Sequence, residues 1–162
     1  MRFCGFSPRT PGIQRLCAEQ EVRKRKVKYP FYHVNQVENA CNNTANYIEE
    51  SYARMAPLGK PMVLEEFGYP RDNYALEAGS PTTGRDAFYA FVFKIIRDSG
   101  KIAGCNFWSW GGLAEVKHPN WQCWDDYTGD PAQEEQGLNS VFAKDESTMN
   151  IIREIATTIN NK

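Results

Sequence analysis

Two adjacent carboxylates, Glu65 and Glu66, stand where a short apolar segment ends. The segment spans residues 62–67, and Gly68 and Pro70 follow it directly, as is typical of the end of a strand. In α/β enzymes the residues at the carboxyl ends of parallel strands carry the chemistry. A carboxylate placed there can act as a nucleophile or stabilise a developing positive charge. The alternative is an inert pair of loop acids.

Side-chain alternation along this segment separates the two glutamates. Successive side chains of a regular strand point to opposite faces, so we expect Glu66 to share a face with Met62 and Leu64. Glu65 then shares the opposite face with Phe67. Only one carboxylate can therefore point into a site that the sheet encloses. We expect Glu65 to face the helix layer or a neighbouring element.

A second apolar segment, residues 102–108, carries side chains that suit the same site. Asn106 and Trp108 share one face of the expected strand, whereas Cys105 and Phe107 share the face that is typical of helix packing. An indole beside a carboxylate suits a carbohydrate, because the indole stacks on the sugar ring while the carboxylate attacks the anomeric carbon. The alternative is that Trp108 and Trp110 are core aromatics, and residue types alone do not decide.

Helical and extended patterns alternate along the chain. Apolar spacings of three and four predict a helix over residues 31–56. Ser80 followed by Pro81 predicts the start of a second helix, which ends at Gly100. A long aromatic and acidic loop, residues 113–143, precedes a last helix that Asp145 or Ser147 caps. This order predicts an α/β fold with parallel strands.

Charge divides the 162-residue chain into two parts. Residues 1–28 hold eight Lys or Arg and two Asp or Glu, whereas residues 29–162 hold eleven and eighteen. We expect segment 1–28 to be a basic, disordered tail, with a localisation or polyanion-binding segment as the alternative. The acidic segment 29–162 argues against a nucleic-acid partner.

Other features of the sequence exclude several classes of protein. The five cysteines form no CxxC pair, so neither a zinc site nor a disulfide framework is predicted. No apolar run approaches the roughly 18 residues of a membrane span, and the N-terminus lacks the apolar core of a signal peptide. We expect no metal and no cofactor. Three acids could bind a metal, but we interpret them as solvated loop residues: Asp125, Asp126 and Asp130.

Three motifs, in this order, resemble glycoside hydrolase family 5 and specifically its endo-β-1,4-mannanases. Residues 59–72 (GKPMVLEEFGYPRD) resemble the seventh strand of that family and residues 106–112 (NFWSWGG) the eighth. Residues 130–148 resemble the lead into the last helix. The resemblance implies an α/β fold that is a partial (β/α)8 TIM barrel, made of the last two β/α units and the preceding helix.

The resemblance also implies roles for individual residues. The family's nucleophile, a Glu followed by an aromatic residue and Gly, falls on Glu66. The Trp of its eighth strand, which supports the sugar, falls on Trp108, with Trp110 as the second choice. The implied substrate is β-mannan or another β-1,4-linked polysaccharide. Further candidate substrate-binding residues are Arg71, Trp121 and Trp124.

Part of the family's catalytic machinery has no counterpart in this sequence. Its general acid/base is a Glu that follows an Asn, and no Asn-Glu dipeptide occurs here. A complete barrel of this kind typically has about 250 residues. We therefore expect residues 29–162 to be a C-terminal fragment of a barrel that is inactive, or nearly so, by itself. Family members are usually secreted or periplasmic, and the localisation of this chain is left open.

Three alternatives to a mannanase remain open. The first is a related β-1,4-glucanase. The second is a non-catalytic carbohydrate-binding remnant that uses the tryptophans. The third is a product without function.

Overall fold

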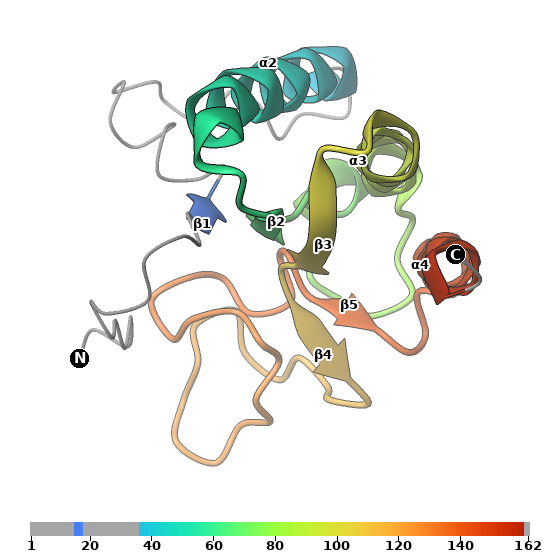
Figure 1. Cartoon of the computed structure of the whole chain (residues 1–162). Coiled ribbons are helices and arrows are strands. Elements are labelled where there is room, and N and C mark those ends of the chain that lie inside the picture. Colours follow the sequence, from blue (N-terminus) through green and yellow to red (C-terminus); the bar gives the residue numbers. More distant parts are fainter. Residues whose placement is uncertain (1–14, 18–35, 161–162) are drawn as a thin grey trace.

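The computed structural model describes residues 15–17 and 36–160 (Figure 1). Two short 3₁₀ helices, Ala56–Leu58 and Asp72–Tyr74, lie among the main elements. The predicted alternation of helices and strands, and with it the α/β class, is confirmed. In chain order the main elements are β1 (Arg15–Cys17), α2 (Val37–Met55), β2 (Met62–Phe67), α3 (Thr83–Ser99), β3 (Ile102–Phe107), β4 (Trp110–Gly112), β5 (Val141–Phe142) and α4 (Glu146–Asn160).

The strands of the described residues form two small parallel sheets. β2 lies between β1 and β3 in the first sheet, and β4 pairs with β5 in the second. The sequence does not predict β1, β4 or β5, because segments of two or three residues show no alternating pattern. β1 lies within segment 1–28, and the other residues of that segment lie outside the described ranges.

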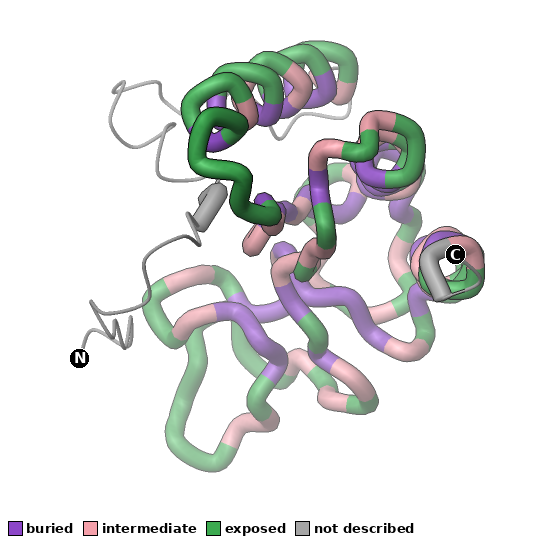
Figure 2. The backbone as a smooth tube through the Cα atoms, in the orientation of Figure 1, coloured by how far each residue is buried: buried purple, intermediate pink, exposed green. Residues whose placement is uncertain are grey.

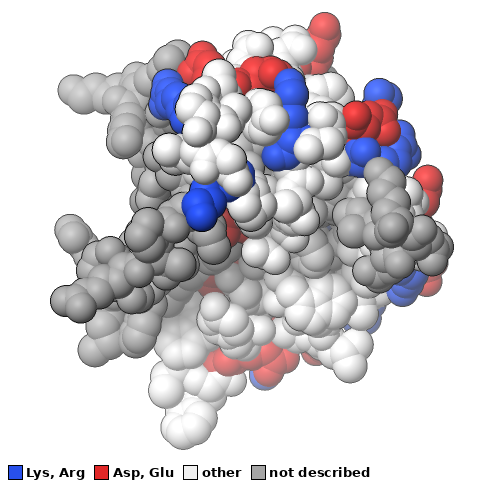
Figure 3. All heavy atoms as spheres, viewed as in Figure 1, with Lys and Arg blue, Asp and Glu red and all other residues white. Residues whose placement is uncertain are grey.

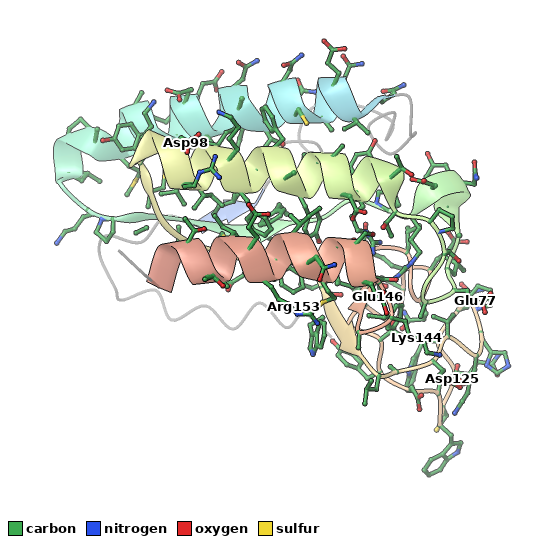
Figure 4. The ribbon with its side chains drawn as sticks, turned by 90° about the vertical axis from the view of Figure 1, so that its right-hand side faces the viewer. Glu77, Asp98, Asp125, Lys144, Glu146 and Arg153 are labelled. Atoms are coloured by element: carbon green, nitrogen blue, oxygen red, sulfur yellow. The ribbon has the colours of Figure 1, made fainter. Side chains whose placement is uncertain are left out.

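Helices α2, α3 and α4 lie side by side in one layer against the first sheet, as Figure 4 shows. Buried residues, coloured purple in Figure 2, recur along the strands and along the helix turns that face them. β2 and α3 supply the centre of this core, and removing their apolar surface from water is the main term that stabilises the arrangement. The largest group of buried apolar side chains from these two elements comprises Met62, Leu64, Phe67, Phe88, Tyr89, Val92, Phe93 and Ile96.

Helix α3 begins two residues later than predicted. Its first residue is Thr83, and the carboxylate of Asp72 accepts hydrogen bonds from the amides of Thr83 and Gly84, both at 3.0 Å. The predicted cap at Ser80 is therefore wrong, because an acid from the preceding loop satisfies the free amides of the first turn. Burial opposes ionisation of Asp72, but these hydrogen bonds prevail and lower its pKa. Gly100 ends the helix as predicted, with a left-handed φ of 65°.

The loop over residues 113–143 has little regular structure but is held by buried polar side chains. The carboxylate of Asp130 accepts hydrogen bonds from the Gly137 amide at 2.8 Å and the Ser140 hydroxyl at 2.6 Å. The hydroxyl of Thr128 donates to the side-chain carbonyl of Gln136 at 2.9 Å. A long irregular loop is thereby folded from within, since buried polar groups need partners.

Charged side chains of both signs intermingle on the face shown in Figure 3. Several form exposed ion pairs, such as Lys94 with Asp98 at 3.1 Å. Among the helices that the structure describes, none has both the length and the apolar character that a membrane span requires.

Candidate active site

The end of β2 departs from regular alternation at the two glutamates. In the pairing with β3, Leu64 lies opposite Cys105 and Phe67 lies opposite Phe107. Two residues of β2, Glu65 and Glu66, therefore oppose the single residue Asn106 of β3. Such a two-against-one arrangement is a β-bulge, a feature that is over-represented beside active sites.

The pairing with β1 identifies the extra residue. Leu16 lies opposite Leu64 and Cys17 lies opposite Glu66, so Glu65 is passed over in this ladder too. With Glu65 counted as the insertion, Glu66 follows Leu64 by one step of alternation and points to the opposite face. Glu66 thus lies at the carboxyl end of β2, on the sheet face away from the helices.

This bulge overturns the predicted sharing of faces. Met62, Leu64 and Phe67 are all buried in the core, and the Phe67 ring contacts three rings of α3. The prediction that Glu66 shares a face with Met62 and Leu64 is therefore wrong. Glu65 and Glu66 are both half-buried and lie outside the core cluster.

Over residues 105–107 the second strand follows the predicted pattern. Cys105 and Phe107 pack against the helix-side core, and Asn106 is exposed on the other face. Burial raises the pKa of the Cys105 thiol to about 11. Asn106 and Glu66 therefore belong to neighbouring strands and lie on the sheet face away from the helices.

Trp108 follows β3 and is joined to the end of β2 through its backbone. Its amide donates a hydrogen bond of 2.7 Å to the carbonyl of Phe67, the residue after Glu66. The peptide bond between Trp108 and Ser109 is cis. The structure thus places the main chains of the predicted nucleophile and the predicted sugar platform at adjacent strand ends.

The other three tryptophans lie further along the chain and are exposed. Trp110, in β4, is 52% exposed and its indole lies against Gly112. Trp121 and Trp124, in the loop before β5, are 40% and 91% exposed. Figure 4 shows that Asp125, the neighbour of Trp124, lies in a loop that projects beyond the three helices. These indoles are accessible surfaces on the segment that follows Trp108.

Arg71 does not have the exposure expected of a substrate contact. Its side chain is 1% exposed, and its guanidinium donates to the carbonyl of Ser140 at 2.8 Å, to the carbonyl of Gly137 and to the carboxylate of Asp145. The same guanidinium stacks over the ring of Phe142 at 5.0 Å. We therefore assign Arg71 a structural role, joining the exit of β2 to the segment before α4.

Asp145 and Arg85 complete this buried network, and sequence reasoning missed both roles. Arg85 donates to the carbonyls of Tyr69 at 2.6 Å and Leu138 at 3.1 Å, and its Nη1 lies 3.4 Å from Asp145. Burial lowers the pKa of Arg85 to about 10, with the nearby charge of Arg71 acting in the same direction. The sequence contains a signal that Arg85 is buried, because Arg85 precedes the buried residues Phe88 and Tyr89 by three and four positions and so lies on the same face of α3.

The loop carboxylates of Asp125 and Asp126 accept hydrogen bonds from backbone amides of the same loop. Asp125 accepts a hydrogen bond from the Gln122 amide at 2.9 Å and lies 3.0 Å from the imidazole of His118. Asp126 accepts from the Glu115 amide at 3.1 Å. Within residues 15–17 and 36–160, no group of three or more His, Cys, Asp or Glu is placed to hold a metal ion.

A family model of glycoside hydrolase family 5 β-mannosidase-like proteins matches residues 28–162. The chain belongs to this family. Membership of glycoside hydrolase family 5 confirms the coarser part of the sequence-based resemblance. A comparison with curated protein sequences finds no significant match.

Solved structures show the same fold for this glycoside hydrolase family 5 domain. A mutant of a family 5 mannosidase from Rhizomucor miehei superposes with a TM-score of 0.75 at 23% identity, over 92% of this chain and 37% of its own. A second mutant of that mannosidase, in complex with mannosyl-fructose, gives 0.73 at 24% identity, over 91% and 37%. An endo-β-1,4-mannanase from Thermotoga petrophila gives 0.50 at 26% identity, over 76% and 23%. The chain thus spans little more than a third of the mannosidase, consistent with part of a barrel.

Proposed function

We propose that this family 5 domain carries the nucleophile of a retaining hydrolase that acts on β-mannosides, and that Glu66 is that nucleophile. The observation that supports it most strongly is the β-bulge, which separates Glu66 from the helix-packed residues of β2. Glu66 then lies at the carboxyl end of a parallel strand, where barrel enzymes carry their chemistry. Trp108, whose amide donates a hydrogen bond to the carbonyl of Phe67, is the proposed platform for the sugar ring.

The proposed reaction is a double displacement. A carboxylate oxygen of Glu66 attacks the anomeric carbon, and the bond between that carbon and the leaving oxygen breaks with its electron pair going to the oxygen. The leaving oxygen then takes up a proton. Water later attacks the glycosyl-enzyme, which frees the sugar and restores the Glu66 carboxylate. In such enzymes a second carboxyl group, about 5 Å from the first, supplies and removes these protons.

The 162 residues on their own are proposed to be inactive or nearly so. No Asn-Glu dipeptide is present to supply the acid/base of the family pattern. General acid–base catalysis contributes roughly 10²–10⁴-fold to the rate of such an enzyme, so we expect the rate to fall by about this factor without the acid/base. An incomplete groove for the polysaccharide would lower the rate further. The finer proposal for specificity is an endo-β-1,4-mannanase, with Trp110, Trp121 and Trp124 as further sugar contacts.

Covalent labelling tests the nucleophile without requiring turnover. A 2-deoxy-2-fluoro-β-mannosyl fluoride needs little help from a general acid, because fluoride leaves without a proton. We expect the intact mass to rise by one fluoromannosyl group and fragment spectra to place it on Glu66. Glu65→Gln is the matched control and should still be labelled, whereas Glu66→Gln should not. Labelling of Glu65, or of neither residue, would contradict the assignment.

Assays on polysaccharide test the remaining claims. We expect the purified chain to release no oligosaccharide from β-mannan. Sustained release that disappears in Glu66→Gln but persists in Glu65→Gln would refute the proposed inactivity while supporting the nucleophile. If release occurs, products longer than mannose indicate the endo type, and mannose alone indicates an exo-acting mannosidase.

Non-catalytic glycan binding is a second candidate function, favoured by the exposure of Trp110, Trp121 and Trp124. Titration with β-mannan and with a β-1,4-glucan, followed by tryptophan fluorescence, tests it. A saturable response without covalent labelling would favour binding alone. A response to the glucan and none to mannan would favour the β-1,4-glucanase alternative.

A further inference from the structure

The main chain of Trp108 is enclosed by three contacts at the end of β2. Its amide donates to the Phe67 carbonyl at 2.7 Å. Its carbonyl oxygen lies against the α-carbon of Gly68, where a β-carbon would stand only 2.6 Å from that oxygen. The hydroxyl of Tyr89, from α3, donates to the same carbonyl at 3.5 Å. We call Gly68 and Tyr89, which hold this carbonyl from two sides, the Trp108 seat.

Gly68 is required at the seat for space. Its φ lies outside the left-handed region, so its backbone conformation is open to other residues. A methyl group there would press on the Trp108 carbonyl oxygen, which belongs to the main chain and cannot rotate away as a side-chain tip could. An alanine at this position must therefore move the end of β2 or the Trp108 peptide.

Tyr89 contacts the Trp108 carbonyl from the helix side of the sheet. Its ring is fully buried and packs on Phe67 of β2 and Phe107 of β3, at centroid distances of 5.1 and 6.1 Å. The two strands thus rest on one side chain, and its hydroxyl reaches the carbonyl of the residue that follows β3. A buried hydroxyl needs an acceptor, and the Trp108 carbonyl lies within reach.

We propose that Gly68 and Tyr89 are positioning residues, which hold the Trp108 peptide at the end of β2 and thereby set the spacing between its indole and the Glu66 carboxylate. This inference rests on the proposed roles of Glu66 and Trp108. Glu66 is followed directly by Phe67 and Gly68, which make two of the three contacts. A shift at the seat therefore changes the geometry of both proposed functional residues together.

A single-tryptophan chain makes the seat measurable. Replacing the three other tryptophans by Phe leaves Trp108 as the one indole, and these three are the exposed ones. In this parent we compare Tyr89→Phe with the matched control Tyr69→Phe, because Tyr69 is also buried and packs on the same helix, against Phe88. Acrylamide quenching of Trp108 measures its accessibility without a ligand, and the thermal midpoint measures stability.

We expect Tyr89→Phe to increase the quenching constant of Trp108 by up to about twofold, because losing this part-buried hydrogen bond lowers the ratio of seated to unseated Trp108 by about that factor. Tyr69→Phe should leave quenching unchanged even where its thermal midpoint falls equally. Gly68→Ala should have a larger effect than Tyr89→Phe, and if it does not fold, the tyrosine pair still decides. Equal quenching in the two tyrosine variants would overturn the seat.

A titration with β-mannan on the same parent separates the seat from the proposed function. A response of Trp108 that weakens in Tyr89→Phe and persists in Tyr69→Phe supports both. If the chain with all four tryptophans responds to β-mannan and Trp108→Phe leaves that response unchanged, the proposed function of Trp108 is contradicted, and the quenching comparison then decides the seat by itself.

Discussion

Replacing Asp145 by Ala should destabilise the chain far more than replacing any exposed acid. Both side chains of the Arg71–Asp145 and Arg85–Asp145 pairs are fully buried. The carboxylate also accepts hydrogen bonds from the amides of Gly79 at 2.9 Å and Phe142 at 2.8 Å. Alanine would leave two buried guanidinium groups without their shared counter-charge, and two amides without an acceptor.

The expected loss in the free energy of unfolding follows from the number of buried groups that Asp145→Ala leaves without a partner. Removing one partner of a buried ion pair costs about 3–5 kcal/mol, whereas whole domains are stable by only about 5–15 kcal/mol. For a chain of this size, each 1 kcal/mol corresponds to roughly 2–4 °C in the thermal midpoint. We therefore expect the midpoint of Asp145→Ala to fall by about 6–20 °C.

Urea and thermal unfolding followed by circular dichroism measure this loss. Asp126→Ala is the matched control, because Asp126 is partly exposed, lies 3.6 Å from Lys117 and also accepts one backbone hydrogen bond. An exposed pair contributes about 0–1 kcal/mol, so the control should unfold almost as the parent does. If Asp145→Ala loses no more stability than Asp126→Ala, the buried network does not hold the exit of β2 as described.

Two further predictions concern pH and loop order. Burial raises the pKa of Tyr69 to about 12 and that of Tyr89 higher still, so their stabilising contribution is complete below the ordinary tyrosine value of about 10 and is lost as pH rises through the folded values. The urea midpoint should therefore fall with pH above about 10, and Tyr69→Phe should reduce the slope; an unchanged slope would contradict this role of Tyr69. The contact of His118 Nδ1 with the Asp125 carboxylate, at 3.0 Å, closes the segment that carries Trp121 and Trp124. His118→Gln should speed tryptic cleavage after Lys117 by about 1.4- to 5-fold, and an unchanged rate would show that this pair does not order the loop.

The main elements are predictable because they depend on local patterns. The predicted strand over residues 62–67 coincides with β2, and the predicted segment 102–108 exceeds β3 by one residue. The apolar stripe of α2 and the glycine that ends α3 are likewise encoded in neighbouring residues. Spacing and punctuation over a few residues are enough for such elements.

The site is harder to predict because it depends on contacts between distant segments. The six-residue segment that contains the two glutamates fits either face assignment, and only pairing with β1 and β3 shows that Glu65 is the extra residue. Charged side chains are usually exposed, so the sequence suggests a substrate contact for Arg71 and a helix cap for Asp145. Only the fold of the loop before α4 shows that the two side chains form a buried pair. Glu66 and Trp108 were predicted from the family resemblance, and their roles stay proposals.

The β-bulge of β2 also has a consequence for sequence alignment. Compared with a relative whose strand is regular, a gap-free alignment anchored on Met62 and Leu64 would match Glu65 to the position that Glu66 occupies in space. An alignment anchored on Phe67 and Gly68 would match Glu66 correctly but displace the core residues of the strand. Homologous positions on the two sides of the bulge therefore require a one-residue gap at Glu65.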